Sequence, residues 1–182
     1  MKFEKTFIDG LIIVTPDIFP DERGYFFESF NKKKFSEGGI DYNFVQDNIS
    51  KSTHGTVRGL HYQVGDFAQG KLCSAVAGKV LDVAVDIRFG SPTFGRHFSV
   101  ELSDETKKQL WIPPGFAHGF SVLSEIAIFG YKCTSFYNRE SERGIKFNDP
   151  DLNIDWKIGS PIVSQKDLLA NSFREMKEEF YY

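Results

Sequence analysis

The sequence predicts an all-β protein, a jelly-roll β-sandwich with short peripheral helices that include one near the C-terminus. Two observations support this fold class, and a third predicts the number of domains. Many short strand-like runs are separated by Gly, Pro, Asn and Asp, which is typical of antiparallel sheets joined by tight turns. Aromatic residues, which suit pleated sheets, make up 15% of the chain. The chain has no internal repeat or linker, so we expect residues 1–182 to form a single domain.

The predicted strands follow one another at short intervals. Residues 71–77 and 80–88 form the clearest pair, which Gly78-Lys79 would join as a hairpin. In its second arm every other residue from Leu81 to Ile87 is apolar, and the alternate positions include Asp82 and Asp86. This period of two predicts one apolar face and one face that carries charge. The other predicted strands are 11–14, 24–30, 58–63, 95–102, 109–112, 119–123 and 127–134.

Helical patterns are few. Residues 32–37 predict one or two turns, and residues 167–180 are the better case, because Leu168, Leu169, Ser172 and Phe173 would share one side. A β-sandwich also has edge strands that need covering, and pairing with a second copy is a common solution. We therefore expect a homodimer.

The composition excludes several classes of protein. The apolar share of 41% and charged share of 26% are those of an ordinary globular protein, and a net charge of -3 lacks the basic excess of a nucleic-acid binder. No run approaches the roughly 18 apolar residues that span a bilayer, and the N-terminus lacks a signal-peptide pattern. Cys73 and Cys133 are expected to be buried thiols. We expect a cytoplasmic protein without a nucleic-acid or membrane partner.

Polar side chains concentrate between residues 46 and 71. If 58–63 is a strand, His61 and Gln63 point to the same side, and Gln46, Asn48 and Ser50 form a second polar row. Burying such a face is costly unless each group has a partner. A polar-lined cavity and a solvated sheet face both account for the pattern, and spacing does not choose between them.

Motifs for metals and phosphates are missing from the sequence. A metal site on a strand would place two imidazoles two residues apart, but position 63 is Gln and position 59 is Gly, so His61 has no adjacent ligand. His118 has no His or Cys close to it along the chain. Because there is also no Gly-rich phosphate loop, an anion would have to be bound by side chains such as Arg23, Arg58 and Lys71. We predict no metal.

Ten segments carry a specific resemblance to a known family. They include RGLHYQ at 58–63 and IPPGFAHGF at 112–120, and the others are 21–28, 46–50, 69–72, 82–88, 90–95, 131–134, 148–150 and 166–167. On these motifs the chain resembles the dTDP-4-dehydrorhamnose 3,5-epimerases, a branch of the cupin superfamily. The resemblance implies a cupin-type jelly-roll homodimer that uses no metal or organic cofactor.

The resemblance also implies an activity. An isomerase of this family would invert dTDP-4-dehydro-6-deoxy-D-glucose at C3 and C5 to give dTDP-4-dehydro-L-rhamnose. By position, His61 would be the general base, Asp167 its paired carboxylate, Tyr131 the acid on the opposite face and Lys71 the cation at the C4 oxygen. A fixed cation stabilises the enolate that forms when a proton leaves the carbon beside a ketone, and inversion needs a second proton donor.

The resemblance extends to the residues that would bind substrate, with Arg23 and Arg58 at the diphosphate. The full set is Arg23, Glu28, Gln46, Asn48, Arg58, Lys71, His118, Glu142 and Lys166. Phe26 and Tyr137 are candidates for stacking on the base, and Asp82 is expected to support Lys71 or His61. The sequence leaves open a single-carbon epimerase, a 3,4-ketoisomerase and a non-catalytic sugar-binding jelly roll, and whether Asp167 reaches His61.

Overall fold

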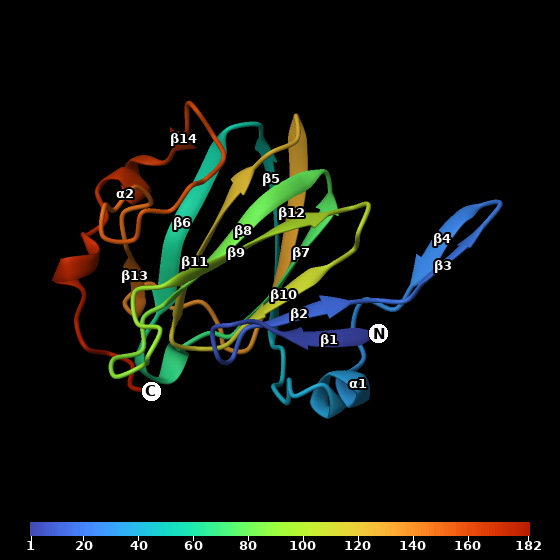
Figure 1. Ribbon diagram of the computed structural model, residues 1–182, viewed down its shortest axis with the longest axis horizontal. Coiled ribbons are helices and arrows are strands. Elements are labelled where there is room, and N and C mark those ends of the chain that lie inside the picture. The colour runs from blue at the N-terminus through green and yellow to red at the C-terminus, as the bar shows by residue number, and fades with distance from the viewer.

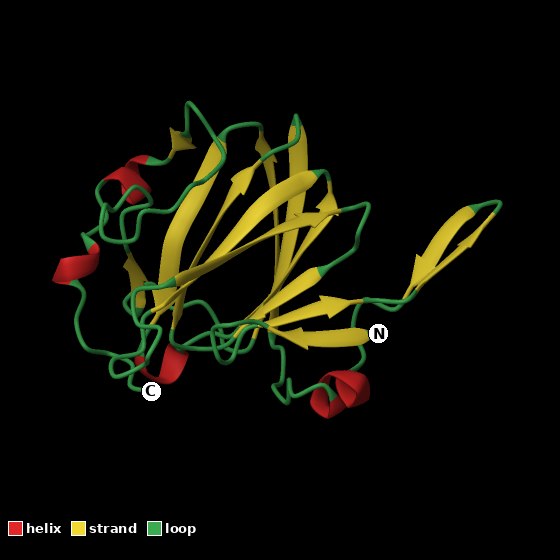
Figure 2. Ribbon diagram, in the orientation of Figure 1, coloured by secondary structure: helices red, strands yellow, loops and turns green.

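The computed structural model describes residues 1–182 and contains two six-stranded sheets that pack face to face (Figures 1 and 2). The first sheet has the strand order β1 (Lys2–Lys5), β2 (Ile12–Thr15), β10 (Gln109–Ile112), β7 (Lys71–Ala77), β12 (Ile126–Cys133) and β5 (Gln46–Thr53). The second has the order β13 (Glu142–Gly144), β6 (Thr56–Gln63), β11 (Phe116–Val122), β8 (Lys79–Asp86) and β9 (His97–Ser103). A short strand, β14 (Ile162–Val163), runs parallel to β6. The predicted β-sandwich is confirmed.

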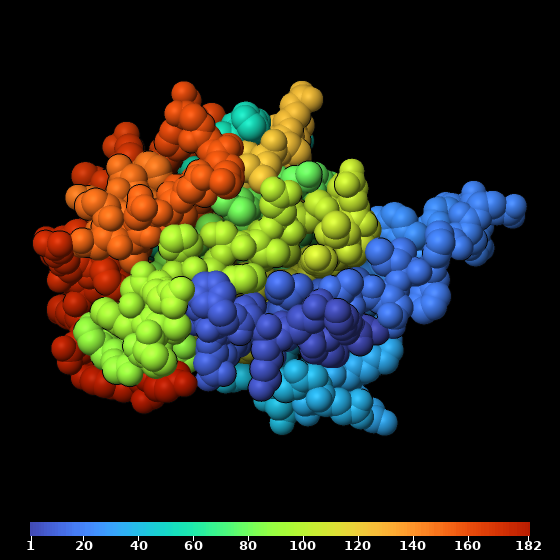
Figure 3. All heavy atoms as spheres, viewed as in Figure 1, coloured from blue at the N-terminus to red at the C-terminus, as the bar shows by residue number.

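Three apolar clusters pack against the sheets, two of them on the faces of the second sheet and one between α1 (Lys32–Glu37) and the first sheet. The largest lies between the sheets, where Cys73, Leu110 and Phe129 of the first sheet meet Val80 and Phe120 of the second. A second cluster lies on the outer face of the second sheet, beneath the chain after residue 145, which covers the β6 side in Figures 1 and 3. Because β8 has a cluster on each face, seven of its eight residues are buried.

The helices are few and short. α1 (Lys32–Glu37) is confirmed: the Asn31 side chain caps it by accepting from the Lys34 amide, and buried Phe35 packs it against the first sheet. No helix is long or apolar enough to cross a membrane.

A short C-terminal helix is present, as predicted, but the extent predicted for it, residues 167–180, is wrong. The chain instead forms α2 (Gln165–Leu168) and a 3₁₀ turn, Phe173–Glu175. α2 ends at Leu168, and Ser172 begins the separate 3₁₀ turn, where its side chain and amide form a capping box with Glu175. Leu169, which the spacing placed on the same side as Leu168 and Phe173, is 80% exposed.

The strand predicted over 24–30 is shorter than expected and belongs to neither sheet. β3 (Ile18–Asp21) and β4 (Gly24–Phe27) form a separate hairpin that projects from the body (Figures 1 and 3). Its aromatic side chains are exposed, with Tyr25 at 57% and Phe26 at 69%. Within one chain, this hairpin therefore leaves apolar surface in contact with solvent.

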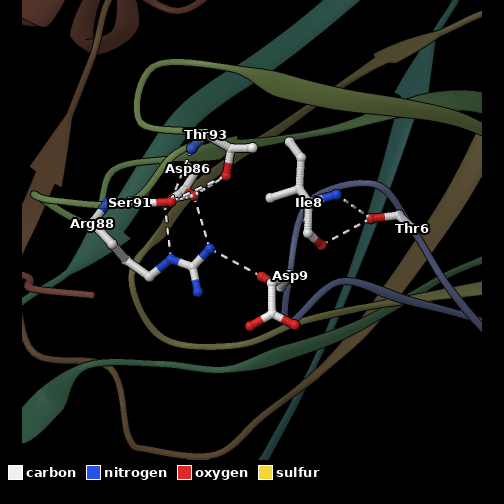
Figure 4. Close-up of polar contacts among 7 residues, drawn as sticks. All are labelled: Thr6, Ile8, Asp9, Asp86, Arg88, Ser91 and Thr93. Carbon is white, nitrogen blue, oxygen red and sulfur yellow. Dashed lines mark hydrogen bonds and ion pairs between the residues drawn. The ribbon is translucent and has the colours of Figure 1, made fainter.

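The charged face predicted on β8 is buried, and its charge is compensated. Asp86 accepts two hydrogen bonds of 2.8 Å from the Arg88 guanidinium and one each from Ser91 and Thr93 (Figure 4). Burial raises the pKa of Asp86, but these hydrogen bonds outweigh it and hold the pKa below its ordinary value. Arg88 also donates to the Asp9 carbonyl oxygen at 2.9 Å, which ties the N-terminal loop to the end of β8.

Candidate active site

A pocket of about 680 Å³ opens between the two sheets. Strands β5, β6, β7, β11 and β12 line it, together with residues 162–167 of the C-terminal segment. Asn48 and Ser50 contribute to its wall, as the period-two row on β5 predicted. The polar pattern therefore belongs to a cavity and not to a solvated sheet face.

His61 and Asp167 form a close pair on one wall. The His61 Nε2 to Asp167 Oδ1 distance is 2.6 Å, although 106 residues separate them along the chain. The backbone positions the carboxylate: Ser164 caps α2 by accepting from the Asp167 amide, and the Gly59 amide donates to Oδ2 at 3.4 Å. Burial raises the pKa of Asp167, but the His61 contact and these polar neighbours lower it below its ordinary value. Asp167 is therefore a carboxylate at neutral pH.

A second histidine–carboxylate pair lies deeper in the pocket. The His118 Nε2 to Asp82 Oδ1 distance is 2.7 Å, and both residues are buried. Burial lowers the pKa of His118 and outweighs the opposing effect of Asp82, so the ring is neutral at pH 7. The hydrogen-bond partner of Asp82 is His118, which the sequence did not suggest, while its charge raises the pKa of Lys71 against the effect of burial, in keeping with the expected support of Lys71.

Lys71 and Tyr131 come from the other sheet. Lys71 is buried, with Nζ 3.4 Å from the His61 carbonyl oxygen and 5.9 Å from the Tyr131 ring centroid. Burial lowers the pKa of Lys71, whereas it raises that of Tyr131 to about 12. Tyr131 is therefore a protonated phenol at neutral pH and can donate a proton.

The two sheets thus place two kinds of group on opposite walls of the pocket. His61 lies on β6 of the second sheet, and Tyr131 lies on β12 of the first. A base on one wall and a phenol on the other suit a reaction in which a proton leaves one face of a substrate and another arrives at the opposite face.

Two glycines that sequence reasoning overlooked bring the histidine strands together. A Cβ on Gly59 would lie 2.6 Å from the Gly119 Cα, and a Cβ on Gly119 would lie 2.7 Å from the Arg58 carbonyl oxygen. Both contacts are with backbone, which cannot move aside as a flexible side chain could. The glycines therefore permit the close approach of β6 and β11 next to His61 and His118, and a glycine beside each candidate histidine was the available sequence signal.

Cys73 was also overlooked as a neighbour of the site. Its Sγ lies 3.6 Å from His118 Nε2, so His118 does have a cysteine beside it in space. The two residues lie on different sheets, 45 positions apart, and no spacing rule links them. Both cysteines are free buried thiols, as predicted.

Four further predicted residues meet at the rim. Glu142 accepts from Lys166 at 2.6 Å and from the Tyr137 hydroxyl at 3.0 Å, and Gln46 accepts from the Tyr137 amide at 2.9 Å. Arg58 lines the pocket and donates to Ser52 at 3.1 Å. The cations at the pocket mouth are therefore Arg58 and Lys166.

Three predicted binding residues do not reach the pocket of their own chain. Arg23 and Phe26 lie on the projecting hairpin, and Glu28 follows it. Arg23 pairs with Asp21 at 2.6 Å, and Glu28 pairs with Lys34 at 3.0 Å. The binding roles expected for these three residues therefore remain predictions, because the hairpin extends away from the sandwich of its own chain.

Comparison with known proteins decides the family. Residues 5–175 match the sequence model of the dTDP-4-dehydrorhamnose 3,5-epimerases. The chain belongs to this family. It is 54% identical to the dTDP-4-dehydrorhamnose 3,5-epimerase of Shigella flexneri over 174 residues, which cover 95% of this chain and 96% of the relative. The predicted resemblance is confirmed across nearly the whole sequence.

Solved structures agree with this assignment. The epimerase of Legionella pneumophila, in complex with dTDP-4-keto-L-rhamnose, is 51% identical with a TM-score of 0.95, covering 100% of this chain and 98% of that one. A 3'-monoepimerase from Streptomyces bikiniensis, in complex with dTDP, is 32% identical with a TM-score of 0.91, covering 98% and 92%. The fold is thus shared by epimerases that differ in how many carbons they invert.

Proposed function

We propose that this chain is a dTDP-4-dehydrorhamnose 3,5-epimerase that converts dTDP-4-dehydro-6-deoxy-D-glucose to dTDP-4-dehydro-L-rhamnose. Membership of the family supports the substrate class. The observation that carries the reaction type is the placement of His61 and Tyr131 on opposite walls of one pocket. A non-catalytic sugar-binding protein would have no need of that arrangement.

In this proposal His61 removes the proton from the carbon beside the ketone. Asp167 orients the ring and stabilises the imidazolium that forms. Negative charge then develops on the C4 oxygen, where the Lys71 ammonium stabilises the enolate in a site shielded from water. Tyr131 delivers a proton to the opposite face, so the configuration inverts. The same steps at the second carbon complete the reaction, which neither oxidises nor reduces the sugar and uses no organic cofactor.

The other pocket residues bind the substrate. His118, held neutral, is a hydrogen-bonding partner for the sugar, whereas Arg58 and Lys166 at the mouth bind the diphosphate. Gln46, Asn48, Tyr137 and Glu142 form the side of the pocket that receives the nucleotide. That the Legionella pneumophila relative binds a dTDP-linked keto sugar supports this assignment.

We further propose that the active form is a homodimer in which each subunit receives the partner's hairpin. Arg23, Phe26 and Glu28 cannot line their own pocket, and the exposed aromatic side chains of the hairpin need a surface to cover them. A second copy would supply both the surface and the missing binding groups. Two free thiols fit the reducing environment of the cytoplasm, where we place the enzyme.

The product of a defined incubation tests the proposed function. The purified chain is incubated with dTDP-4-dehydro-6-deoxy-D-glucose, with and without a chelator, and the product is analysed by NMR. We expect inversion at both C3 and C5, unaffected by the chelator. Inversion at one carbon would make the chain a monoepimerase, the activity of the 32% identical Streptomyces bikiniensis relative. Transfer of the carbonyl to C3 would indicate a ketoisomerase, and an unchanged sugar would indicate a binding protein.

A further inference from the structure

Three potential metal ligands meet at the floor of the pocket. Cys73 on β7, Asp82 on β8 and His118 on β11 each offer one ligand atom, and these atoms lie within 4.8 Å of one another. His118 Nε2 is the central atom, 2.7 Å from Asp82 Oδ1 and 3.6 Å from Cys73 Sγ. The residues are buried, and His118 borders the pocket.

The types of these atoms are those of a zinc site. Zinc is bound by Cys sulfur at about 2.3 Å and by His nitrogen or carboxylate oxygen at about 2.0–2.2 Å, so ligand atoms around one tetrahedral ion lie roughly 3–4 Å apart. The 3.6 Å between His118 and Cys73 lies in this range. The 2.7 Å between His118 and Asp82 is a hydrogen bond, and an ion that replaces its proton would move the two atoms apart by about half an ångström. Three protein ligands with a fourth position open are the arrangement of sites that exchange a bound water or small molecule.

A second observation points to a cation at this place. Asp82 Oδ2 is buried and has no hydrogen-bond partner, although Asp82 is completely shielded from solvent. A buried carboxylate oxygen without a donor is costly, and a coordinated cation compensates such an oxygen. The His118 bond uses only the other oxygen of this carboxylate.

Binding would release protons from the site. The Cys73 thiol must lose its proton, and the ion replaces the proton shared between His118 Nε2 and Asp82.

We propose that Cys73, Asp82 and His118 bind a thiophilic divalent cation, with Zn²⁺ preferred, and that the bound ion inhibits the enzyme. The ion would bind the His118 nitrogen and place a positive charge at the floor of the pocket, which His118 and Lys71 line, so it would disturb the place that the sugar occupies. The inhibition rests on the proposed function, but the binding does not.

Variants of the two cysteines test the binding, with Cys133 as the control for Cys73. Cys73→Ala and Cys73→Ser remove the proposed ligand, and Cys133→Ala removes the other buried thiol, whose neighbour is Asn48 at 3.5 Å. Zn²⁺ is titrated into each metal-free protein by calorimetry, and Co²⁺ is used to detect a thiolate-to-metal absorption band. We expect one ion per chain in the parent and in Cys133→Ala. Both Cys73 variants should bind more weakly by at least about tenfold, the loss that even outer-shell changes cause at metal sites.

Thermal melting of each variant confirms that it is folded before the titration is interpreted. The proposal is overturned if the parent binds no ion, or if Cys73→Ser binds Zn²⁺ as tightly as Cys133→Ala. Activity adds a second readout: Zn²⁺ should inhibit the parent and Cys133→Ala reversibly, and Cys73→Ser should resist it. If the parent fails to epimerise the keto sugar, the proposed function fails, and calorimetry still decides whether the site exists.

Discussion

The two histidine–carboxylate pairs of the pocket have nearly the same contact and very different surroundings. The nitrogen–oxygen distances are 2.6 Å for His61 and Asp167 and 2.7 Å for His118 and Asp82. The His61 side chain is 30% exposed, however, and the His118 side chain only 7%. Asp167 also accepts from the Gly59 amide, whereas the second oxygen of Asp82 has no partner.

This difference indicates that burial, more than pairing, distinguishes the roles that we propose for the two histidines. A base must take up a proton, carry a positive charge for a time and release the proton again. His61 meets these requirements, because it is partly exposed to solvent and its partner Asp167 is held in place by the Gly59 amide. His118 sits where a charged ring is unfavourable, so it remains a neutral hydrogen-bonding group.

The largest expected effect is on activity and separates His61 from the other histidines. His61→Ala should lower kcat by about 10²–10⁴-fold, the usual contribution of a general base. His54 lies in an exposed turn, where it contacts the Leu123 carbonyl, and His54→Ala should keep the parent activity. Steady-state rates of the two variants provide the measurement. Substantial turnover by His61→Ala would contradict the proposed role.

The loss of stability should be larger when His118 is removed than when His61 is removed. His118→Ala leaves the Asp82 carboxylate buried without its partner, and breaking a buried pair in this way costs about 3–5 kcal/mol. His61→Ala should cost less, about 1–3 kcal/mol, because Asp167 keeps its Gly59 contact. Urea unfolding of both variants, compared with the parent, measures the difference. Equal losses of unfolding free energy would mean that burial does not distinguish the pairs.

A smaller effect should appear in the pH dependence of stability. Because the folded pKa of His118 lies below its unfolded value, the unfolded chain binds a proton that the folded chain does not as pH falls below about 6.5. The free energy of unfolding should therefore decrease from about pH 7 to about pH 5, by at most about 1.4 kcal/mol per pH unit for this group. His118→Gln should reduce the slope, and His97, whose pKa burial also lowers, should maintain part of it. An unchanged slope in His118→Gln would contradict this assignment.

Local patterns in the sequence predicted much of the fold. The alternation from Leu81 to Ile87, the helix at 32–37 and the polar row on β5 all depend on neighbours along one strand or helix. The extent of the C-terminal helix was predicted wrongly, because the spacing of Leu168 and Leu169 indicates an apolar side but not whether any surface packs against it. For the same reason, the strand pattern at 24–30 could not show that this strand forms a separate hairpin outside both sheets.

The site depends on contacts that no local pattern contains. His61 and Asp167 are 106 residues apart, and only the resemblance to the family suggested their pairing. Asp82 meets His118 because β8 and β11 pair in a register that places Phe120, two residues on from His118, opposite Asp82. Cys73 approaches His118 from the facing sheet. Strand register and sheet packing created these contacts, and neither can be read from spacing alone.

Proton exchange with solvent tests the central claim most directly, namely that His61 and Tyr131 act from opposite faces of the sugar. The parent, His61→Ala and Tyr131→Phe are incubated with dTDP-4-dehydro-6-deoxy-D-glucose in deuterated water, and NMR locates the deuterium. We expect deuterium at C3 and C5 with inversion in the parent, and neither deuterium nor inversion with His61→Ala. The pKa of Tyr131, about 12, keeps its phenol protonated at neutral pH. Because Tyr131→Phe removes this proton donor from the opposite face, the variant should exchange protons with little inversion. Exchange that persists in His61→Ala, or full inversion by Tyr131→Phe, would contradict the central claim.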